Sequence, residues 1–395
     1  MTQRIKKGIL LLAALLCLLL CACTAAPEGE PTQPTPEVTP TPVPTPVPLN
    51  QPLELNLPLE LTDGDAATWV GGYVVLHNPE RKIGSVYLRW DKLPPQWTLT
   101  ADGKEIVVEE NGFLHQYVEL PEPASEVSFS AEVPLCEVFA FEQGSQLPDW
   151  VQVWQPTLEH ADLLLLPTHA DDEHVFFGGM MPYYAGEKGY KVQVVYLTNH
   201  WSQAYRPHEL LDGLWTAGIR NYPVIGPFAD RWADSLEDAE AMYSRYDVAV
   251  FLTEQLRRFK PSVVIGHDLK GEYGHGVHVL NAVALTDAVL AATDALIFPE
   301  SAEQYGTWNT PKLYLHLYPE HEIVMDWSVP LTAFDGKTAM DVAREAFALH
   351  ETQQGFFYVY GEGDDWDSRR FGLYRSTVGP DTVGGDVFEN ITSFY

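Results

Sequence analysis

The second half of the chain alternates short apolar runs with longer segments of helical length. Runs typical of buried strands occupy residues 162–166, 191–197, 222–225, 262–266 and 312–317. Segments typical of helices occupy the stretch from the turn after Leu166 to about Gly189, then 207–219, 245–259, 277–292 and 336–350. Strands that alternate with helices predict an α/β fold, a mostly parallel sheet with helices on both faces. Ligands of such sheets collect at the carboxyl ends of the strands.

Residues 51–156 show short strand-like runs separated by turn residues, without a long helical period. The runs lie at 84–90, 97–100, 105–108, 115–120, 127–133 and 136–141, with turn signals at Asp102-Gly103 and Asn111-Gly112. This pattern predicts an all-β sandwich of about 100 residues. Its order resembles a galactose-binding-like jelly roll, a type of module that often binds carbohydrate. A packing module without a ligand is the alternative.

The amino terminus has the pattern of a secretory signal. Arg4, Lys6 and Lys7 precede an apolar run of 15 residues, Ile9 to Cys23. That run is shorter than the roughly 20 residues of a membrane-spanning helix. Leu20-Cys21-Ala22-Cys23 resembles the lipobox of bacterial lipoproteins, which implies a signal peptide over 1–22 and a lipid on Cys23. An ordinary signal peptide and an uncleaved anchor are the alternatives.

A proline-rich stretch separates this signal from the rest. Residues 26–48 contain nine prolines, interleaved with Thr, Val and Glu. Proline fixes φ and removes a hydrogen-bond donor, so 23–50 is predicted to be an extended spacer rather than a domain. Residues 157–395 then form the α/β domain. We expect an extracytoplasmic protein held at the bacterial cell membrane by its lipid anchor.

Charge and cysteine content exclude several classes of protein. The chain has 24 Lys and Arg against 55 Asp and Glu, a net charge of −31, which argues against nucleic-acid binding. Three of the four cysteines lie within the first 23 residues. Only Cys136 remains for the folded part, which excludes an internal disulfide or a cysteine-rich zinc site. The oligomeric state is not readable from the sequence.

Histidine and carboxylate residues cluster after two of the predicted strands. His169-Ala170-Asp171-Asp172-Glu173-His174 follows the strand at 162–166, and the segment from His267 to His278 follows the strand at 262–266. Imidazole and carboxylate together suit zinc or another divalent first-row metal. Three such ligands leave one position for a water molecule, and a spare carboxylate beside it can act as a base.

These two segments also resemble a known family. The run LLLLPTHADDEHVFFGG is similar to the start of PIG-L/LmbE-like deacetylases, whose signature is a strand followed by HPDDE. The run VVIGHDLKGEYGHGVHV is similar to their second signature, which usually ends in GHPDH. The resemblance covers about residues 160–390 and implies a Rossmann-like fold. It also implies a zinc-dependent enzyme that removes acetyl groups from N-acetylglucosamine-type sugars.

Carried over residue by residue, the resemblance assigns the catalytic groups. The metal ligands are His169, Asp172 and His278. Asp171 is the base, and His275 stabilises the oxyanion or protonates the leaving amine. Tyr273 matches a tyrosine near that site. Residues with a weaker case for contacting substrate are Arg206, Glu209, His200, Asp268 and His350.

The sequence departs from the family pattern at three positions. Ala170 and Gly276 stand where proline is usual, and Val277 stands where the family has an aspartate between the two histidines. That aspartate can interact with the catalytic histidine, so Asp268 or Glu272 is expected to replace it as the partner of His275.

The resulting hypothesis is a lipid-anchored, zinc-dependent N-deacetylase that acts on an N-acetylated glycan or glycoconjugate. Two alternatives remain. One is a carbohydrate-binding lipoprotein whose deacetylase-like domain is inactive, and the other is a metal-dependent esterase or amidase with a different substrate.

Overall fold

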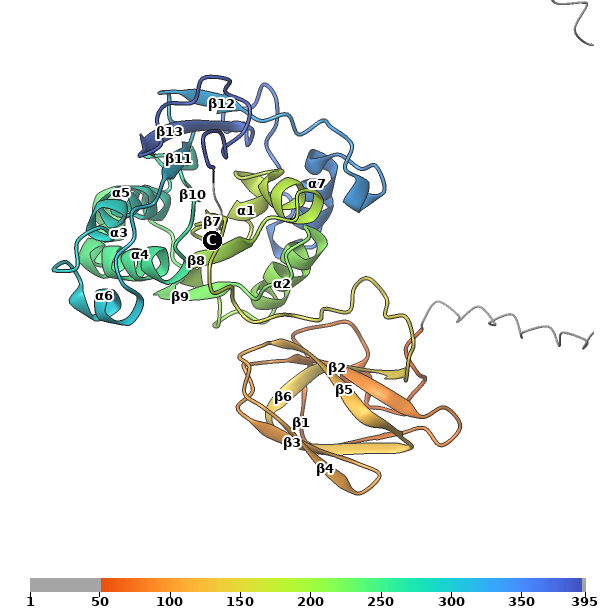
Figure 1. The fold of residues 1–395 in the computed structure, drawn as a ribbon. Helices are drawn as coiled ribbons and strands as arrows, with labels where there is room; N and C mark the ends of the chain where they lie inside the picture. Colours follow the sequence, from red (N-terminus) through yellow and green to blue (C-terminus); the bar gives the residue numbers. More distant parts are fainter. Residues whose placement is uncertain (1–50, 393–395) are drawn as a thin grey trace, which may run out of the picture. The chain divides into compact units, whose positions relative to one another are not determined.

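A seven-stranded mixed sheet forms the centre of the carboxyl-terminal part of the chain. The computed structural model describes residues 51–392, and the sheet order within them is β12-β13-β11-β10-β7-β8-β9 (Figure 1). The strands are β7 (Leu163–Leu165), β8 (Val192–Asn199), β9 (Val224–Ala229), β10 (Val263–Gly266), β11 (Lys312–His316), β12 (Glu322–Val324) and β13 (Arg370–Ser376). Strands β11, β10, β7, β8 and β9 are parallel, whereas β13 and β12 form an antiparallel edge. The expected α/β fold is confirmed, and the antiparallel edge is an addition to it.

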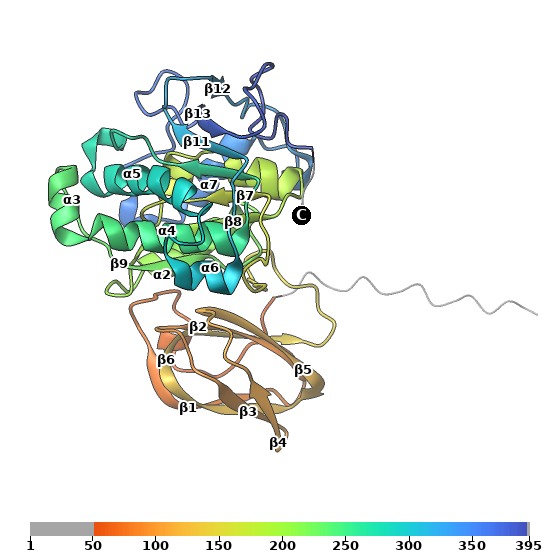
Figure 2. The same ribbon diagram turned by 60° about the vertical axis from the view of Figure 1, so that its left-hand side comes forward.

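Helices cover both faces of this sheet, as Figure 2 shows. They are α1 (Asp172–Val175), α2 (Arg206–Thr216), α3 (Leu236–Met242), α4 (Arg245–Phe259), α5 (Gly276–Ala291), α6 (Pro299–Tyr305) and α7 (Ala339–Ala348). Successive residues of a strand point to opposite faces. Leu163 and Leu165 therefore belong to the core that contains α2 and α7, while Leu164 and Leu166 belong to the core that contains α4 and α5.

The long helix expected between Leu166 and Gly189 is interrupted. Helix α1 has only four residues, and a π-helical turn, η2 (Met181–Glu187), follows after a break. Gly178 has a φ of +49°, and a Cβ on Gly179 would lie 2.7 Å from atoms of Trp327 and Ala339. The break therefore lets the chain pack closely against the segment before α7, which the helical pattern could not predict.

The amino-terminal module is a single antiparallel sheet of six strands. It consists of β1 (Val70–His77), β2 (Ile83–Trp90), β3 (Trp97–Ala101), β4 (Lys104–Val108), β5 (His115–Ala124) and β6 (Glu126–Glu142). The two runs expected at 127–133 and 136–141 are one continuous strand, β6. Its first half pairs with β1 and β3 and its second half with β2, so the strands expected in two sheets are hydrogen-bonded into one. The jelly-roll resemblance stays a prediction.

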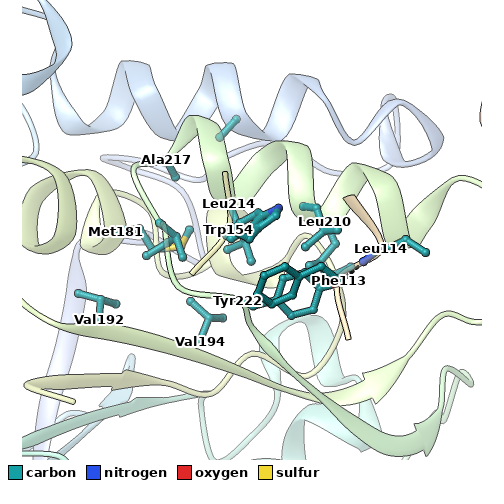
Figure 3. Packing of buried hydrophobic residues seen from close by; sticks show 14 of the residues in the cluster. Phe113, Leu114, Trp154, Met181, Val192, Val194, Leu210, Leu214, Ala217 and Tyr222 are labelled. Carbon is teal, nitrogen blue, oxygen red and sulfur yellow. Dashed lines mark hydrogen bonds between the residues drawn. The ribbon is translucent and has the colours of Figure 1, made fainter. Parts of the chain in front are cut away.

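The β-module and the α/β part share one hydrophobic core. The ring of Phe113 stacks on that of Tyr222 with centroids 4.7 Å apart, and the Leu114 N–H donates to the Tyr222 hydroxyl at 3.0 Å. Leu210 of α2 and Trp154 complete the contact (Figure 3). The described residues, 51–392, accordingly form one compact unit, and the boundary at 156/157 stays a prediction.

Among the described residues, no helix has the length and apolar character needed to span a membrane. The predicted signal peptide, Cys23 and the proline-rich spacer all lie outside the described residues. Their assignment is unchanged from the sequence analysis.

Replacing Glu137 by Gln should stabilise the fold at alkaline pH. Glu137 is buried in β6, where Oε1 accepts the Gly64 N–H at 2.6 Å and Oε2 has no partner. Burial raises its pKa to about 7, with Asp63 adding to the shift and Arg89 opposing it. The pKa of Glu137 is higher in the folded chain than in the unfolded chain. Its contribution to the free energy of unfolding is therefore fully present at low pH and is lost as pH rises through about 7.

Glu137→Gln should therefore raise the free energy of unfolding by on the order of 1 kcal/mol at pH 8, after allowance for solvent screening. The difference in free energy of unfolding between Glu137→Gln and the parent should be smaller at pH 5. Denaturant unfolding at the two pH values measures it, with the exposed Glu105→Gln as the control. An equal effect at both pH values would contradict the prediction.

Candidate metal centre

The predicted site residues meet at the carboxyl edge of the parallel strands. His169 and Asp172 follow β7, and His275 and His278 follow β10 at the start of α5. Parallel strands end at the same edge of a sheet, so loops distant in sequence converge there. Further polar residues reach this edge after neighbouring strands: Asp230 after β9, His267 after β10 and His316 at the end of β11.

Three donor atoms from the predicted ligands face one another. His169 Nδ1 lies 3.0 Å from His278 Nε2. Asp172 Oδ2 lies 3.4 Å from the first of these atoms and 3.3 Å from the second. Ligands about 2.1 Å from a tetrahedral zinc ion are separated from one another by about 3.4 Å. All three side chains are buried, and their spacing fits one divalent cation with a coordination position left open.

A buried carboxylate, Glu272, orients His278. It accepts hydrogen bonds from the Nδ1 atoms of three histidines, His267 at 2.8 Å, His278 at 2.9 Å and His316 at 2.7 Å. Burial opposes its charge, but the imidazoles hold the pKa of Glu272 well below its usual value. Because His278 donates from Nδ1, its Nε2 lone pair is free to face the centre.

Asp230 lies near His169 but is not hydrogen-bonded to it. Its Oδ1 lies 3.6 Å from His169 Nε2, and its Oδ2 lies 3.1 Å from His200 Nδ1. Burial opposes the charge, whereas His200 and His169 lower the pKa of Asp230 below its usual value. The carboxylate therefore favours a proton on the outer nitrogen of His169 and leaves Nδ1 to bind a cation.

Backbone donors fix Asp172. Its Oδ2 accepts the N–H of Thr168 at 3.1 Å and that of His169 at 2.7 Å. His267 Nε2 lies 3.4 Å from the same oxygen. Burial opposes ionisation, but the nearby imidazoles hold the pKa of Asp172 well below its usual value. The carboxylate is thus kept ionised, the form that binds metal.

Asp171 is held beside the centre in an uncommon backbone conformation, with φ at +124°. Its N–H donates to Glu173 Oε2 at 2.9 Å, and its Oδ1 lies 3.5 Å from Arg206 Nη2. The same Arg206 atom contacts the Ala170 carbonyl. Burial raises the pKa of Asp171 and Arg206 opposes that shift. Arg206 therefore positions this carboxylate.

His275 has a backbone partner in place of the expected carboxylate. Its Nδ1 accepts the Val277 N–H at 3.1 Å, which leaves the proton of the neutral ring on Nε2. The ring lies 4.8 Å from that of His169 and 4.7 Å from that of His278, between centroids. The expectation that Asp268 or Glu272 partners His275 is wrong, because Glu272 is taken up by three other imidazoles.

Comparison with known proteins decides the family. Residues 164–289 match the family described as PIG-L, GlcNAc-PI de-N-acetylase. A 1D-myo-inositol 2-acetamido-2-deoxy-alpha-D-glucopyranoside deacetylase from Rhodococcus erythropolis is 31% identical over 241 residues, which cover 48% of this chain and 80% of that protein. The chain belongs to the PIG-L family. The prediction that it is a deacetylase, a hydrolase of N-acetyl amide bonds, is thereby confirmed.

More distant similarities accompany this match. A deacetylase of the same description from Frankia casuarinae is 25% identical over 297 residues, covering 58% of this chain and 95% of that protein. Among solved structures, the N,N'-diacetylchitobiose deacetylase from Pyrococcus horikoshii is 18% identical and has a TM-score of 0.38. It covers 51% of this chain and 74% of the other. A score that low carries no argument.

Two departures from the PIG-L signatures supply hydrogen bonds that proline cannot make. Ala170 stands where proline is usual, and its N–H donates to His200 Nε2 at 2.9 Å. The Gly276 N–H likewise donates to the Ala233 carbonyl at 2.8 Å. A Cβ on Gly276 would lie 2.0 Å from the Ser235 carbonyl oxygen. The second position therefore requires glycine because the segment before α3 packs against it.

The remaining candidate residues lie around the centre in different roles. Glu209 accepts the N–H and hydroxyl of Thr352 at 2.8 and 2.6 Å, and it lines a cavity of about 560 Å³ beside the β-module. Asp268 caps its own turn by accepting the Lys270 N–H at 3.1 Å. His350 lies near His174 rather than beside the three ligands. Among the described residues, none of these three is hydrogen-bonded or ion-paired to a predicted ligand.

Sequence reasoning did not foresee that Glu272, Asp230, His267 and His316 surround the predicted ligands. It named Glu272 only as a partner of His275 and gave the other three no individual role. Three of them, Asp230, His267 and His316, lie at or directly after the end of a parallel strand. Their place at or after the end of a predicted strand was the sequence feature from which a role at the site could have been predicted. The order of strands in the sheet, which the sequence does not state, determines which of these ends are neighbours.

Replacing Glu272 by Gln should weaken metal binding. A Gln amide offers one acceptor oxygen where three imidazole N–H groups now donate, and its NH₂ group opposes one of them. We expect zinc affinity to fall by about 10- to 100-fold. Competition with a chromogenic chelator measures this, with the exposed Glu303→Gln as a matched control. Equal affinity of Glu272→Gln and the parent would contradict the role assigned to Glu272.

Proposed function

We propose that this protein is a zinc-dependent deacetylase of N-acetylated sugars, of the N-acetylglucosamine type, held at the outer surface of a bacterial membrane. The observation that carries the proposal is the triangle of His169 Nδ1, Asp172 Oδ2 and His278 Nε2, with edges of 3.0 to 3.4 Å, beside Asp171 and His275. A spare carboxylate and a neutral imidazole next to three metal ligands are what amide hydrolysis requires.

The ligand set suits zinc because two imidazoles and one carboxylate match its preferred donors. A cation bound there supplies Lewis acidity, which polarises a carbonyl and acidifies water. Every other part of the reaction falls to side chains of this chain. Asp171 accepts the proton of the attacking water, and Arg206 keeps its carboxylate directed toward the centre.

His275 stabilises the oxyanion as a hydrogen-bond donor. The Val277 N–H occupies Nδ1, so the proton on Nε2 is the one available to a substrate oxygen. Burial lowers the pKa of His275, with His278 and His169 adding to the shift. A ring that stays neutral can donate a hydrogen bond to the oxyanion but is poorly suited to deliver a proton to the leaving amine. Asp171 can deliver that proton once it has accepted the proton of water.

A rim of aromatic rings beside His275 supports a sugar substrate. The Trp232 ring is 56% exposed, lies 4.4 Å from the His275 ring, and stacks on Tyr273 with centroids 5.9 Å apart and planes 16° apart. Phe357 and Trp366 lie against the other sides of Tyr273 at 5.4 and 5.8 Å. Aromatic faces offer apolar area at low entropic cost, which fits the C–H face of a pyranose ring.

The location is carried by the amino-terminal sequence. A lipid on Cys23 attaches the chain to the membrane, and the proline-rich segment up to residue 50 separates the catalytic part from the lipid surface. This arrangement favours a surface glycan, a cell-wall fragment or a glycolipid as substrate.

Loss of the base should abolish turnover while metal remains bound. Asp171→Asn removes the proton acceptor, so we expect kcat for acetate release to fall by about 100- to 10,000-fold with metal content unchanged. The assay measures acetate from N-acetylglucosamine and its β-linked oligomers, with the exposed Asp149→Asn as control. The proposal would be contradicted if the metal-loaded parent released no acetate from any of these sugars. If it released acetate from acetyl esters instead, the protein would be an esterase.

Removal of the Trp232 ring should weaken binding of oligosaccharides selectively. We expect Trp232→Ala to raise KM for the dimer and longer oligomers by about tenfold, with kcat changed by less than about twofold. Trp69→Ala removes another exposed indole, on the β-module, and serves as the control. The same KM for every chain length in Trp232→Ala and parent would show that the rim does not contact substrate.

A further inference from the structure

A second cluster of metal-ligating side chains lies apart from the three predicted ligands. Glu173 and His174 belong to α1, and His350 follows α7. Glu173 Oε1 lies 3.3 Å from His174 Nε2 and 3.7 Å from His350 Nε2. The three donor atoms all lie within 4.8 Å of one another, and all three side chains are completely buried.

None of these facing atoms has a hydrogen-bond partner. Glu173 Oε1 and both ring nitrogens of His174 and His350 are buried and unpaired, five atoms in one place. A buried polar group that is left unpaired destabilises the fold. Among the described residues, Glu173 forms ion pairs with these two histidines only, so no lysine or arginine pairs with its charge.

The backbone of α2 approaches the cluster closely at a glycine. Gly213 of α2 faces the two rings, and a Cβ there would lie 2.7 Å from His174 Nε2 and 2.8 Å from His350 Nε2. Any side chain at position 213 would therefore press against both Nε2 atoms, which lie on the same side of the cluster, facing α2. Two imidazoles and a carboxylate form a donor set for zinc, with ligand distances near 2.1 Å.

We propose that Glu173, His174 and His350 bind a second divalent metal ion, of the zinc class, distinct from the catalytic one. The ion takes the lone pairs of Glu173 Oε1 and of the two Nε2 atoms, which satisfies three of the five unpaired atoms and neutralises the buried carboxylate. The site is enclosed, so the ion enters as the chain folds and contributes to stability rather than to turnover.

Metal counting on the full chain tests this without reference to activity. Protein is produced with added zinc, purified without chelator, and analysed by mass spectrometry of its metal content. We expect about two zinc ions per chain in the parent and about one in a His169→Ala, Asp172→Ala double variant. His350→Leu and Gly213→Ala should each retain about one, the second because its added methyl group presses against the Nε2 atoms of two intact ligands. The exposed His77→Gln should retain about two.

One zinc ion in the parent and none in the double variant would overturn the proposal and leave a protonated carboxyl or an ordered water at the cluster. That result decides the matter even where His350→Leu fails to fold. The same measurement tests the proposed catalytic site independently of the second site. The catalytic proposal predicts that His350→Leu keeps the ion bound by His169, Asp172 and His278.

Discussion

The hydrogen bonds that three buried imidazoles donate to the Glu272 carboxylate are the interaction on which the catalytic centre depends. A carboxylate with no exposed surface is tolerated only where its charge is matched and its lone pairs are filled. His267, His278 and His316 do both; the first two belong to the segment after β10 that also contains Glu272, and the third lies at the end of β11. The same bonds choose the tautomer of His278 and so decide which of its nitrogens carries the lone pair that faces His169 and Asp172. The orientation of the predicted metal ligand His278 is thus set by a residue that is not itself a predicted ligand.

The two histidines of the second signature have opposite electrostatic surroundings. His278 donates to a carboxylate, whereas His275 accepts from a backbone N–H and has no carboxylate beside it among the described residues. The first arrangement strengthens a ligand, and the second keeps a ring neutral with its proton on Nε2. Val277 contributes its main chain to this arrangement while its side chain joins the buried core between the sheet and α4. With valine in place of the family aspartate, the partner of His275 is therefore a main-chain N–H rather than a carboxylate.

Glu173 connects the two polar clusters. One of its oxygens accepts the N–H of Asp171, whose backbone is held at a positive φ, and the other faces His174 and His350. Whatever fixes Glu173 therefore also fixes the carboxylate assigned as the base. A metal ion at the second cluster would hold this connection rigid, which gives the loop after β7 a support on its buried side.

The sequence by itself determined the α/β class, the alternation of strands and helices, the family and the three side chains, predicted as metal ligands, that converge at the sheet edge. These follow from local pattern: apolar runs form buried strands, and the polar residues after two of them carry the PIG-L signatures. It could not determine the break after α1, the single sheet formed through β6, or the residues that orient the ligands. Those depend on which strands are neighbours and on close approaches such as that of Gly179 to Trp327. Asp230 and His316 become part of the site only because β9 and β11 end at the same edge as β7 and β10, and that edge exists only in the folded sheet.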